Sequence, residues 1–277
     1  MGGVFVINGQ YDKLAVYKSI FMNFHAKYTN MYSIENSEYH NHPHNMIIYN
    51  SAFIMVVNTE TYCRIFFQCM QEEDLSDILS ILYYSFKKTM IIEQVYKKSN
   101  IMQENIIKNT GYRLYGSLKR LSKQVSKLDM PATIDENIVF ANTKDIDSII
   151  ALHSSIFDKY IDRELTYNNM TALIKKNNVF IYKSNNQILG CIIYEKRGRF
   201  FHLKYWFTDK NNIKYKKGIG KALLNKLYKI AGSSNYIEVW CKTDNTTALN
   251  IYTKYNFKED GLKCDIFTAN NASMLIS

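Results

Sequence analysis

The spacing of apolar and polar residues predicts two runs of strands and helices that follow one another along the chain. In the first run, short apolar segments separated by Asn-containing turns are typical of strands, and apolar residues three or four positions apart indicate helices. The first run is predicted to contain strands at 46–49, 52–57 and 62–69, a helix at 72–87, a strand at 90–96, a helix at 100–109 and a strand at 112–118.

The second run repeats this order after two helices of its own. It is predicted to contain a strand at 138–141, helices at 145–157 and 166–176, strands at 179–182, 188–195 and 200–207, a helix at 217–231, a strand at 236–241 and a helix after Asn245. We therefore expect two domains, at residues 1–130 and 131–277, joined by the basic segment 119–130 as a linker. The fold class is α/β with a mixed sheet, and the first domain is interpreted as a degenerate copy of the second. An unrelated α+β domain is the alternative.

The N-terminal 45 residues carry a weaker pattern. It predicts a short strand at 4–7, a helix at 11–28 and a polar loop at 33–45 that contains His40, His42 and His44. Histidines at alternate positions can bind a metal, but no cysteine or carboxylate cluster accompanies them, so we predict no metal site.

Composition narrows the function classes. The chain of 277 residues has a net charge of +10, and its lysines are spread along the sequence, which favours an anionic cofactor or substrate over nucleic acid. Five scattered cysteines without metal-ligand spacing indicate buried free thiols in a reducing compartment. No signal peptide and no apolar run of membrane-spanning length are found, so a cytoplasmic location is expected, with no membrane partner.

A glycine-rich turn between the predicted strand at 200–207 and helix at 217–231 is the candidate ligand site. It consists of Tyr215, Lys216, Lys217, Gly218, Ile219, Gly220 and Lys221. Two glycines at a helix start let the backbone approach a ligand closely, and the free N–H groups of that first turn attract phosphate. The pattern therefore predicts a diphosphate site, although a tight loop that only allows helix and strand to pack would look the same.

A second motif follows one strand later. Asn245, Ala248, Tyr252 and Phe257 are spaced as in the Asn-x-x-Ala-x-x-x-Tyr-x-x-x-Gly-Phe helix of the GNAT superfamily of N-acetyltransferases, which this half of the chain resembles over about residues 137–268. In that family a Gln/Arg-x-x-Gly-x-Gly/Ala turn binds the pyrophosphate of acetyl-CoA. Two positions differ: Tyr215 replaces the usual Arg or Gln, and Asn256 replaces the usual Gly.

The resemblance implies acetyl-CoA as acyl donor, bound where two neighbouring strands part. Backbone groups at Phe207 and Thr208 would pair with pantetheine, Asn245 would cap its helix and contact the same arm, and Tyr252 would protonate the CoA thiolate. Glu238 is the candidate general base, with His202, Glu195 or a water-mediated route as alternatives.

These observations predict an acetyl-CoA-dependent N-acetyltransferase that acts on a primary amine of a small molecule or peptide. A non-catalytic acyl-CoA-binding module is the alternative, and the acceptor and oligomeric state stay open. The first domain is not expected to bind the cofactor, because Gln71, Glu72, Glu73 and Asp74 stand where the phosphate-binding turn would be.

Overall fold

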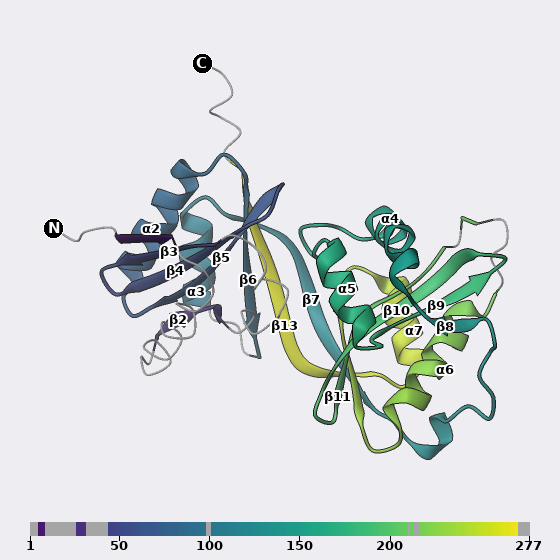
Figure 1. Ribbon diagram of the computed structural model, residues 1–277. Helices are drawn as coiled ribbons and strands as arrows, with labels where there is room; N and C mark the ends of the chain where they lie inside the picture. Colours follow the sequence, from purple (N-terminus) through teal and green to yellow (C-terminus); the bar gives the residue numbers. More distant parts are fainter. Residues whose placement is uncertain are drawn as a thin grey trace. The chain divides into compact units, whose positions relative to one another are not determined.

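The computed structural model describes residues 5–8, 26–31, 44–97, 101–209, 211–212 and 217–270. The chain divides into two compact units (Figure 1). Unit 1 comprises residues 1–118 and 262–277, and unit 2 comprises residues 119–261. The strand β7 (Arg113–Gln124) begins in unit 1 and ends in unit 2, whereas β13 (Lys258–Ala269) begins in unit 2 and ends in unit 1.

Unit 1 has the strand order β1-β3-β4-β5-β6-β13, and β2 pairs separately with β5. Its further elements are β1 (Phe5–Asn8), β2 (Tyr28–Thr29), β3 (His44–Tyr49), β4 (Ala52–Asn58), β5 (Tyr62–Cys69), α2 (Glu72–Ser85), β6 (Thr89–Tyr96) and α3 (Ile101–Asn109). The apolar faces of α2 and α3 close one core over this sheet, built around Leu79, Ile107 and Phe67.

Unit 2 has the strand order β7-β12-β11-β10-β9-β8. Its elements after β7 are β8 (Ile138–Phe140), α4 (Ile146–Ile156), α5 (Tyr167–Lys175), β9 (Val179–Ser184), β10 (Gln187–Arg197), β11 (Phe200–Thr208), α6 (Ile219–Ala231), β12 (Tyr236–Lys242) and α7 (Thr246–Lys254), with 3₁₀ turns η3 (Lys127–Asp129) and η4 (Thr143–Asp145). All strands and helices predicted between residues 46 and 118, and in the second run, are therefore present.

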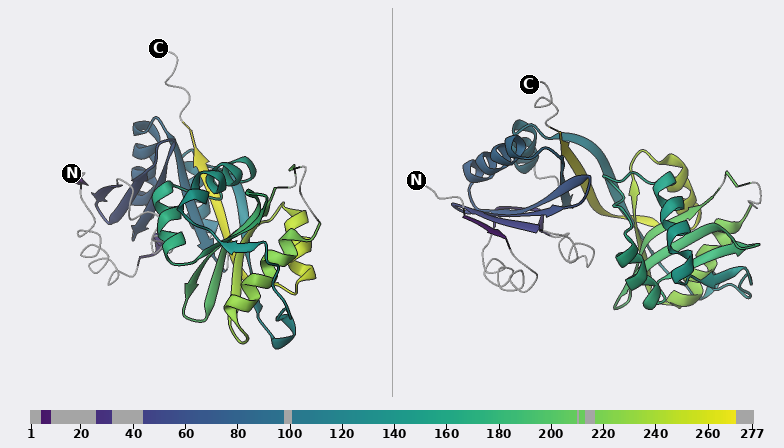
Figure 2. Two further views of the ribbon diagram at one scale, coloured as in Figure 1. Left: turned by 45° about the vertical axis from the view of Figure 1, so that its right-hand side comes forward. Right: turned by 45° about the horizontal axis from the view of Figure 1, so that its top comes forward.

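Two cores cover the two faces of the unit 2 sheet. Residues of α6 and α7 pack on one face, and residues of α4 and α5 pack on the other (Figure 2). Gly190 on β10 allows α6 to lie close to the sheet, because a Cβ at this position would stand 2.9 Å from Leu223 Cδ1. All five cysteines are buried and free, as predicted.

The predicted linker at 119–130 is wrong for its first half, because Lys119–Gln124 continue strand β7. Its basic residues are held by acids: Arg120 Nε donates to Asp260, and Lys123 Nζ lies 2.6 Å from Asp129 Oδ1. Leu121 and Val125 are buried in the core of unit 2. The contacts thus divide the chain near residue 118 and again near residue 262, whereas the sequence placed one boundary after residue 130.

Most of the helix predicted at 11–28 and of the loop at 33–45 lies outside the described residues, including His40 and His42. Where the structure describes this stretch, Tyr28 lies in strand β2 and His44 begins β3. No helix in the described part of the chain is both long and apolar enough to cross a membrane.

Candidate active site

The site begins where β11 and β12 part. These parallel strands pair through only four residue pairs, from Phe200 with Tyr236 to Leu203 with Val239, although both strands continue further. A β-bulge at the same point shifts the register between β10 and β11, so that Ile193 opposes Tyr205 while Tyr194 opposes Leu203. Beyond Leu203, β12 no longer pairs with β11, and no other described strand pairs with β11 along that edge. The sequence analysis predicts that the pantetheine arm of the coenzyme binds along this edge, at Phe207 and Thr208.

The first turn of α6 is the predicted diphosphate site. Gly218 is its N-cap with φ +108°, a conformation that only glycine adopts readily, and a Cβ there would meet no atom within 4 Å. The first intrahelical bond runs from Ala222 N to Gly218 O, so the N–H groups of residues 219–221 have no helical partner. The first turn holds no acid, and Lys217 and Lys221 are exposed beside it. Tyr215 and Lys216 lie outside the described residues.

The helix α7 brings the second motif to the same place. Asn245 is its N-cap, with the side-chain oxygen accepting from Ala248 N at 3.0 Å, as predicted. Tyr252 is 7% exposed, and burial raises the pKa of its hydroxyl far above the usual value. Its ring lies 5.7 Å from that of Trp206, which belongs to the parted stretch of β11.

Trp206 links the two motifs. Its ring also lies against α6, where a Cβ on Gly220 would stand 3.5 Å from Trp206 Cζ2. The first turn of α6 and the Tyr252 phenol therefore flank one residue of the parted strand. Sequence reasoning placed backbone groups near this position but assigned the indole no role.

The three candidate bases lie in one row across the sheet. Glu195 on β10 opposes His202 on β11, which opposes Glu238 on β12. Glu238 is 6% exposed, and its Oε2 lies 3.1 Å from His202 Nδ1 and 3.5 Å from Arg120 Nη1. Glu195 instead pairs with Lys204, 3.1 Å away, and burial lowers the pKa of that lysine to about 8. Glu238 and His202 thus form a contact pair one residue before the strands part, which distinguishes Glu238 from Glu195.

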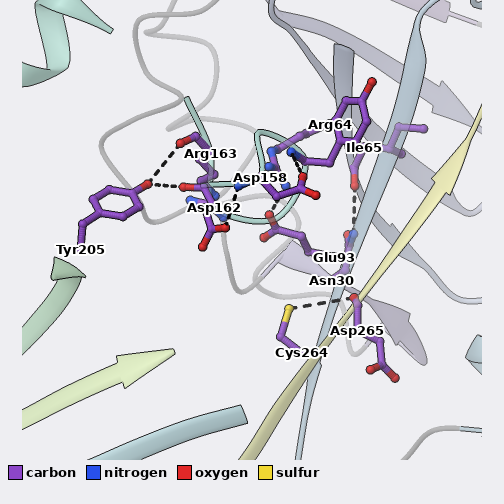
Figure 3. Close-up of polar contacts among 11 residues, drawn as sticks. Asn30, Arg64, Ile65, Glu93, Asp158, Asp162, Arg163, Tyr205, Cys264 and Asp265 are labelled. Carbon is purple, nitrogen blue, oxygen red and sulfur yellow. Dashed lines mark hydrogen bonds and ion pairs between the residues drawn. The ribbon is translucent and has the colours of Figure 1, made fainter. Parts of the chain in front are cut away.

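Aromatic side chains support β11 from the opposite face. Phe207 and Tyr205 pack against Phe157 and the imidazole of His153, whose centroid lies 4.4 Å from that of Tyr205. The Tyr205 hydroxyl donates to the carbonyls of Asp162 and Arg163 in the segment between α4 and α5 (Figure 3). This cluster therefore ties the parted strand to the segment between α4 and α5.

His153 is expected to make unit 2 sensitive to mild acid. It is 3% exposed, neither ring nitrogen has a hydrogen-bond partner, and burial lowers its pKa to about 4. Because the unfolded state takes up this proton near pH 6.5 and the folded state does not, the free energy of unfolding falls as pH drops from 6.5 to 4. The loss is about 3 kcal/mol.

Replacement of His153 by phenylalanine should remove this slope and leave the aromatic stack in place. Both tryptophans of the chain, Trp206 and Trp240, lie in unit 2, so urea unfolding followed by tryptophan fluorescence at pH 7 and pH 5 measures the effect. Equal pH dependence in the two proteins would contradict it.

Comparison with known proteins identifies the fold. Residues 146–257 match the Acetyltransferase (GNAT) family. A GNAT-family acetyltransferase from Colwellia psychrerythraea is 13% identical, with a TM-score of 0.57 over 97% of this chain and 100% of that one. A tandem GNAT protein from the clavulanic acid biosynthesis pathway, solved without AcCoA, is 8% identical, with a TM-score of 0.58 over 96% and 98% of the two chains. A GCN5-related N-acetyltransferase from Sphaerobacter thermophilus is 12% identical, with a TM-score of 0.54 over 81% and 79%. No curated protein matches the sequence significantly.

Unit 2 thus has the GNAT fold, with a mixed sheet in which β11 and β12 part beside a glycine-capped helix. Over residues 146–257 it is similar to the GNAT acetyltransferase family. Unit 1 is a second GNAT-like domain, as the repeated order of elements predicted and as the likeness to the tandem GNAT protein supports.

Proposed function

We propose that unit 2 is an acetyl-CoA-dependent N-acetyltransferase that transfers the acetyl group directly to a primary amine of a small molecule or peptide. The observation that carries the proposal is the parting of β11 from β12 between the free first turn of α6 and the Tyr252 phenol. The coenzyme would supply the activated acetyl thioester, and the residues of the chain would bind and orient it.

Each part of the site has a role that its chemistry fits. Backbone N–H groups of Ile219, Gly220 and Lys221 would hold the diphosphate, with Lys217 adding positive charge. Backbone groups of Phe207 and Thr208 would pair with the pantetheine amides beside the Asn245-capped helix. Tyr252 carries its proton at neutral pH, as tyrosines ordinarily do, and burial raises its pKa further, so its hydroxyl is the group that would donate a proton to the departing thiolate.

Isothermal titration with acetyl-CoA, followed by a thiol-release assay over polyamine, amino-sugar, lysine-peptide and peptide N-terminal acceptors, tests the proposal. Binding together with thiol release that depends on one acceptor class is expected. Binding without turnover on every acceptor would identify a non-catalytic acyl-CoA-binding module instead, and no binding would refute both.

Glu238 is proposed as the general base, and its replacement by glutamine is expected to lower kcat/KM at least about tenfold. Glu195→Gln is the matched control, since Glu195 lies in the same row but pairs with Lys204. If His202→Gln lowers kcat/KM much more than Glu238→Gln does, the imidazole accepts the proton and Glu238 orients it.

A further inference from the structure

Unit 1 contains the same opening between strands as unit 2. The strand β4 covers one edge of β5 along its whole length, from Cys63 to Cys69. On the other edge β6 pairs with β5 only at four positions, from Tyr62 to Ile65. Four parallel pairs followed by parting is also the pattern of β11 and β12. The open edge of β5 beyond Ile65 is therefore the counterpart of the proposed cofactor-binding edge of β11.

A segment of the chain itself fills this edge in unit 1. The short strand β2 pairs antiparallel with β5, placing Tyr28 opposite Cys69 and Thr29 opposite Gln68. Asn30 continues the contact: its backbone N–H donates to Phe67 O at 3.1 Å, and its side-chain amide accepts from Phe67 N at 2.6 Å and donates to Ile65 O at 2.9 Å (Figure 3). The Asn30 amide thus satisfies the two backbone groups nearest the point where the strands part.

The helix α3 holds this segment from the other side. The buried side chain of Gln103 accepts from Thr29 N at 3.4 Å and donates to Thr29 O at 3.3 Å. The Tyr28 hydroxyl lies 3.1 Å from Met102 Sδ. The segment 28–30 is therefore bonded along β5 and along α3, in the space between them.

The end of α3 matches the end of α7, which fixes the residue equivalences. Gly111 (φ +95°) and Asn256 (φ +62°) both end their helix in the left-handed region. The next residues then donate five positions back, Tyr112 N to Ile107 O at 3.3 Å and Phe257 N to Tyr252 O at 3.0 Å.

Counting back along both helices, Ile107 stands where unit 2 has Tyr252, and Gln103 stands where it has Ala248. Unit 1 therefore has an apolar residue at the position of the proposed proton donor Tyr252. At the position of Ala248 it has Gln103, the glutamine that binds Thr29. The helix after β5 also begins with Glu72, Glu73 and Asp74, whose charges oppose a phosphate at its N-terminus.

We propose that unit 1 has exchanged the cofactor site for a strand-docking site, in which the opening between β5 and β6 takes the extended segment 28–30 in place of an acyl-CoA arm. The inference rests on the proposed function in one respect: the ligand excluded from unit 1 is the ligand proposed for unit 2. Docking of the segment anchors the N-terminal part of unit 1 to its sheet, and it makes the full chain a binder of one coenzyme.

Two measurements on the unaltered full chain test this inference. Site-resolved amide hydrogen exchange should find Phe67 and Asn30 protected like interior sheet residues, because each N–H donates in the docked state. Native mass spectrometry with acetyl-CoA should show one coenzyme per chain. Rapid exchange at both amides, or two coenzymes per chain, would overturn the inference.

Variants sharpen the test. Asn30→Ala should speed exchange at Phe67 about tenfold, and Gln103→Ala should do the same at Thr29. Asn105→Ala is the matched control, because Asn105 is exposed on the same helix as Gln103. Exchange at Phe67 that Asn30→Ala leaves unchanged would count against docking, and if a variant does not fold, the measurements on the unaltered chain decide.

The test separates this inference from the proposed function. A chain that binds no acetyl-CoA but protects Phe67 and Asn30 refutes the function of unit 2 and keeps the docked segment. Two coenzymes per chain would refute docking and leave the function of unit 2 standing.

Discussion

Replacing Tyr252 with phenylalanine is expected to lower kcat about 100-fold and to leave the affinity for acetyl-CoA within about twofold. The substitution removes only the hydroxyl, so the ring still packs against Trp206 and Phe257, 5.7 and 5.3 Å away between centroids. The thiolate would then leave without a proton donor, which costs rate and not binding. Thiol release under saturating acetyl-CoA and titration calorimetry measure the two quantities.

Tyr255→Phe is the matched control for this variant. Tyr255 follows α7, and its ring lies 6.2 Å from Trp206, but the motif gives its hydroxyl no role. Unchanged kcat in Tyr252→Phe would show that the phenol does not protonate the leaving group. A loss of acetyl-CoA affinity with kcat preserved would assign Tyr252 to binding.

The elements of both units could be predicted because local patterns specify them. Apolar periodicity determines α2 and α4, and Asn185 and Asn186, both with positive φ, form the turn of the β9–β10 hairpin. The starts of α6 and α7 follow from equally local signals: Gly218 and Asn245 act on the backbone of their own helices, so a short stretch of sequence contains each signal. The binding roles assigned to these residues stay predictions.

Contacts between distant residues were not predictable in this way. The segment 119–124 was interpreted as part of a linker, because the acidic partners of Lys119 and Arg120, which are Glu259 and Asp260, lie 140 positions away. Tyr28 was placed at the end of a helix, although the bonds that make it a strand come from β5, about 40 residues later. His153 shows no signal at all, since only the aromatic rings around it keep its pKa low.

The two units show how one opening can serve two purposes. In both, a strand parts from its neighbour after four residue pairs and exposes backbone groups that require partners. In unit 1 the strand β2 and Asn30 supply those partners, and the helix after β5 begins with three acids. In unit 2 the following helix begins without an acid and with lysines beside it. The charge at the helix start therefore distinguishes the unit proposed to bind the coenzyme.

Reversing the charge at the start of α6 in unit 2 should abolish the binding of acetyl-CoA at micromolar concentrations. In the double variant Lys217→Glu, Lys221→Glu, two exposed lysines become acids at the first turn of α6, as in α2 of unit 1. Losing two cation–phosphate contacts and adding two repulsions should weaken acetyl-CoA binding at least about 100-fold. The fold should not suffer, because acids at a helix N-terminus stabilise the helix by about 0.3–1 kcal/mol.

Two comparisons make this last result specific. Lys229→Glu changes the charge of the same helix at its last turn, where no phosphate is expected, and should leave acetyl-CoA affinity nearly unchanged. Acetyl-pantetheine carries no diphosphate, so the double variant should use it as well as the unaltered protein does. If the double variant uses acetyl-pantetheine as poorly as it uses acetyl-CoA, relative to the unaltered protein, the lysines act on the fold of the site and not on the phosphates. If it binds acetyl-CoA normally, the diphosphate lies elsewhere, and the glycine-capped turn only allows α6 to pack beside β11.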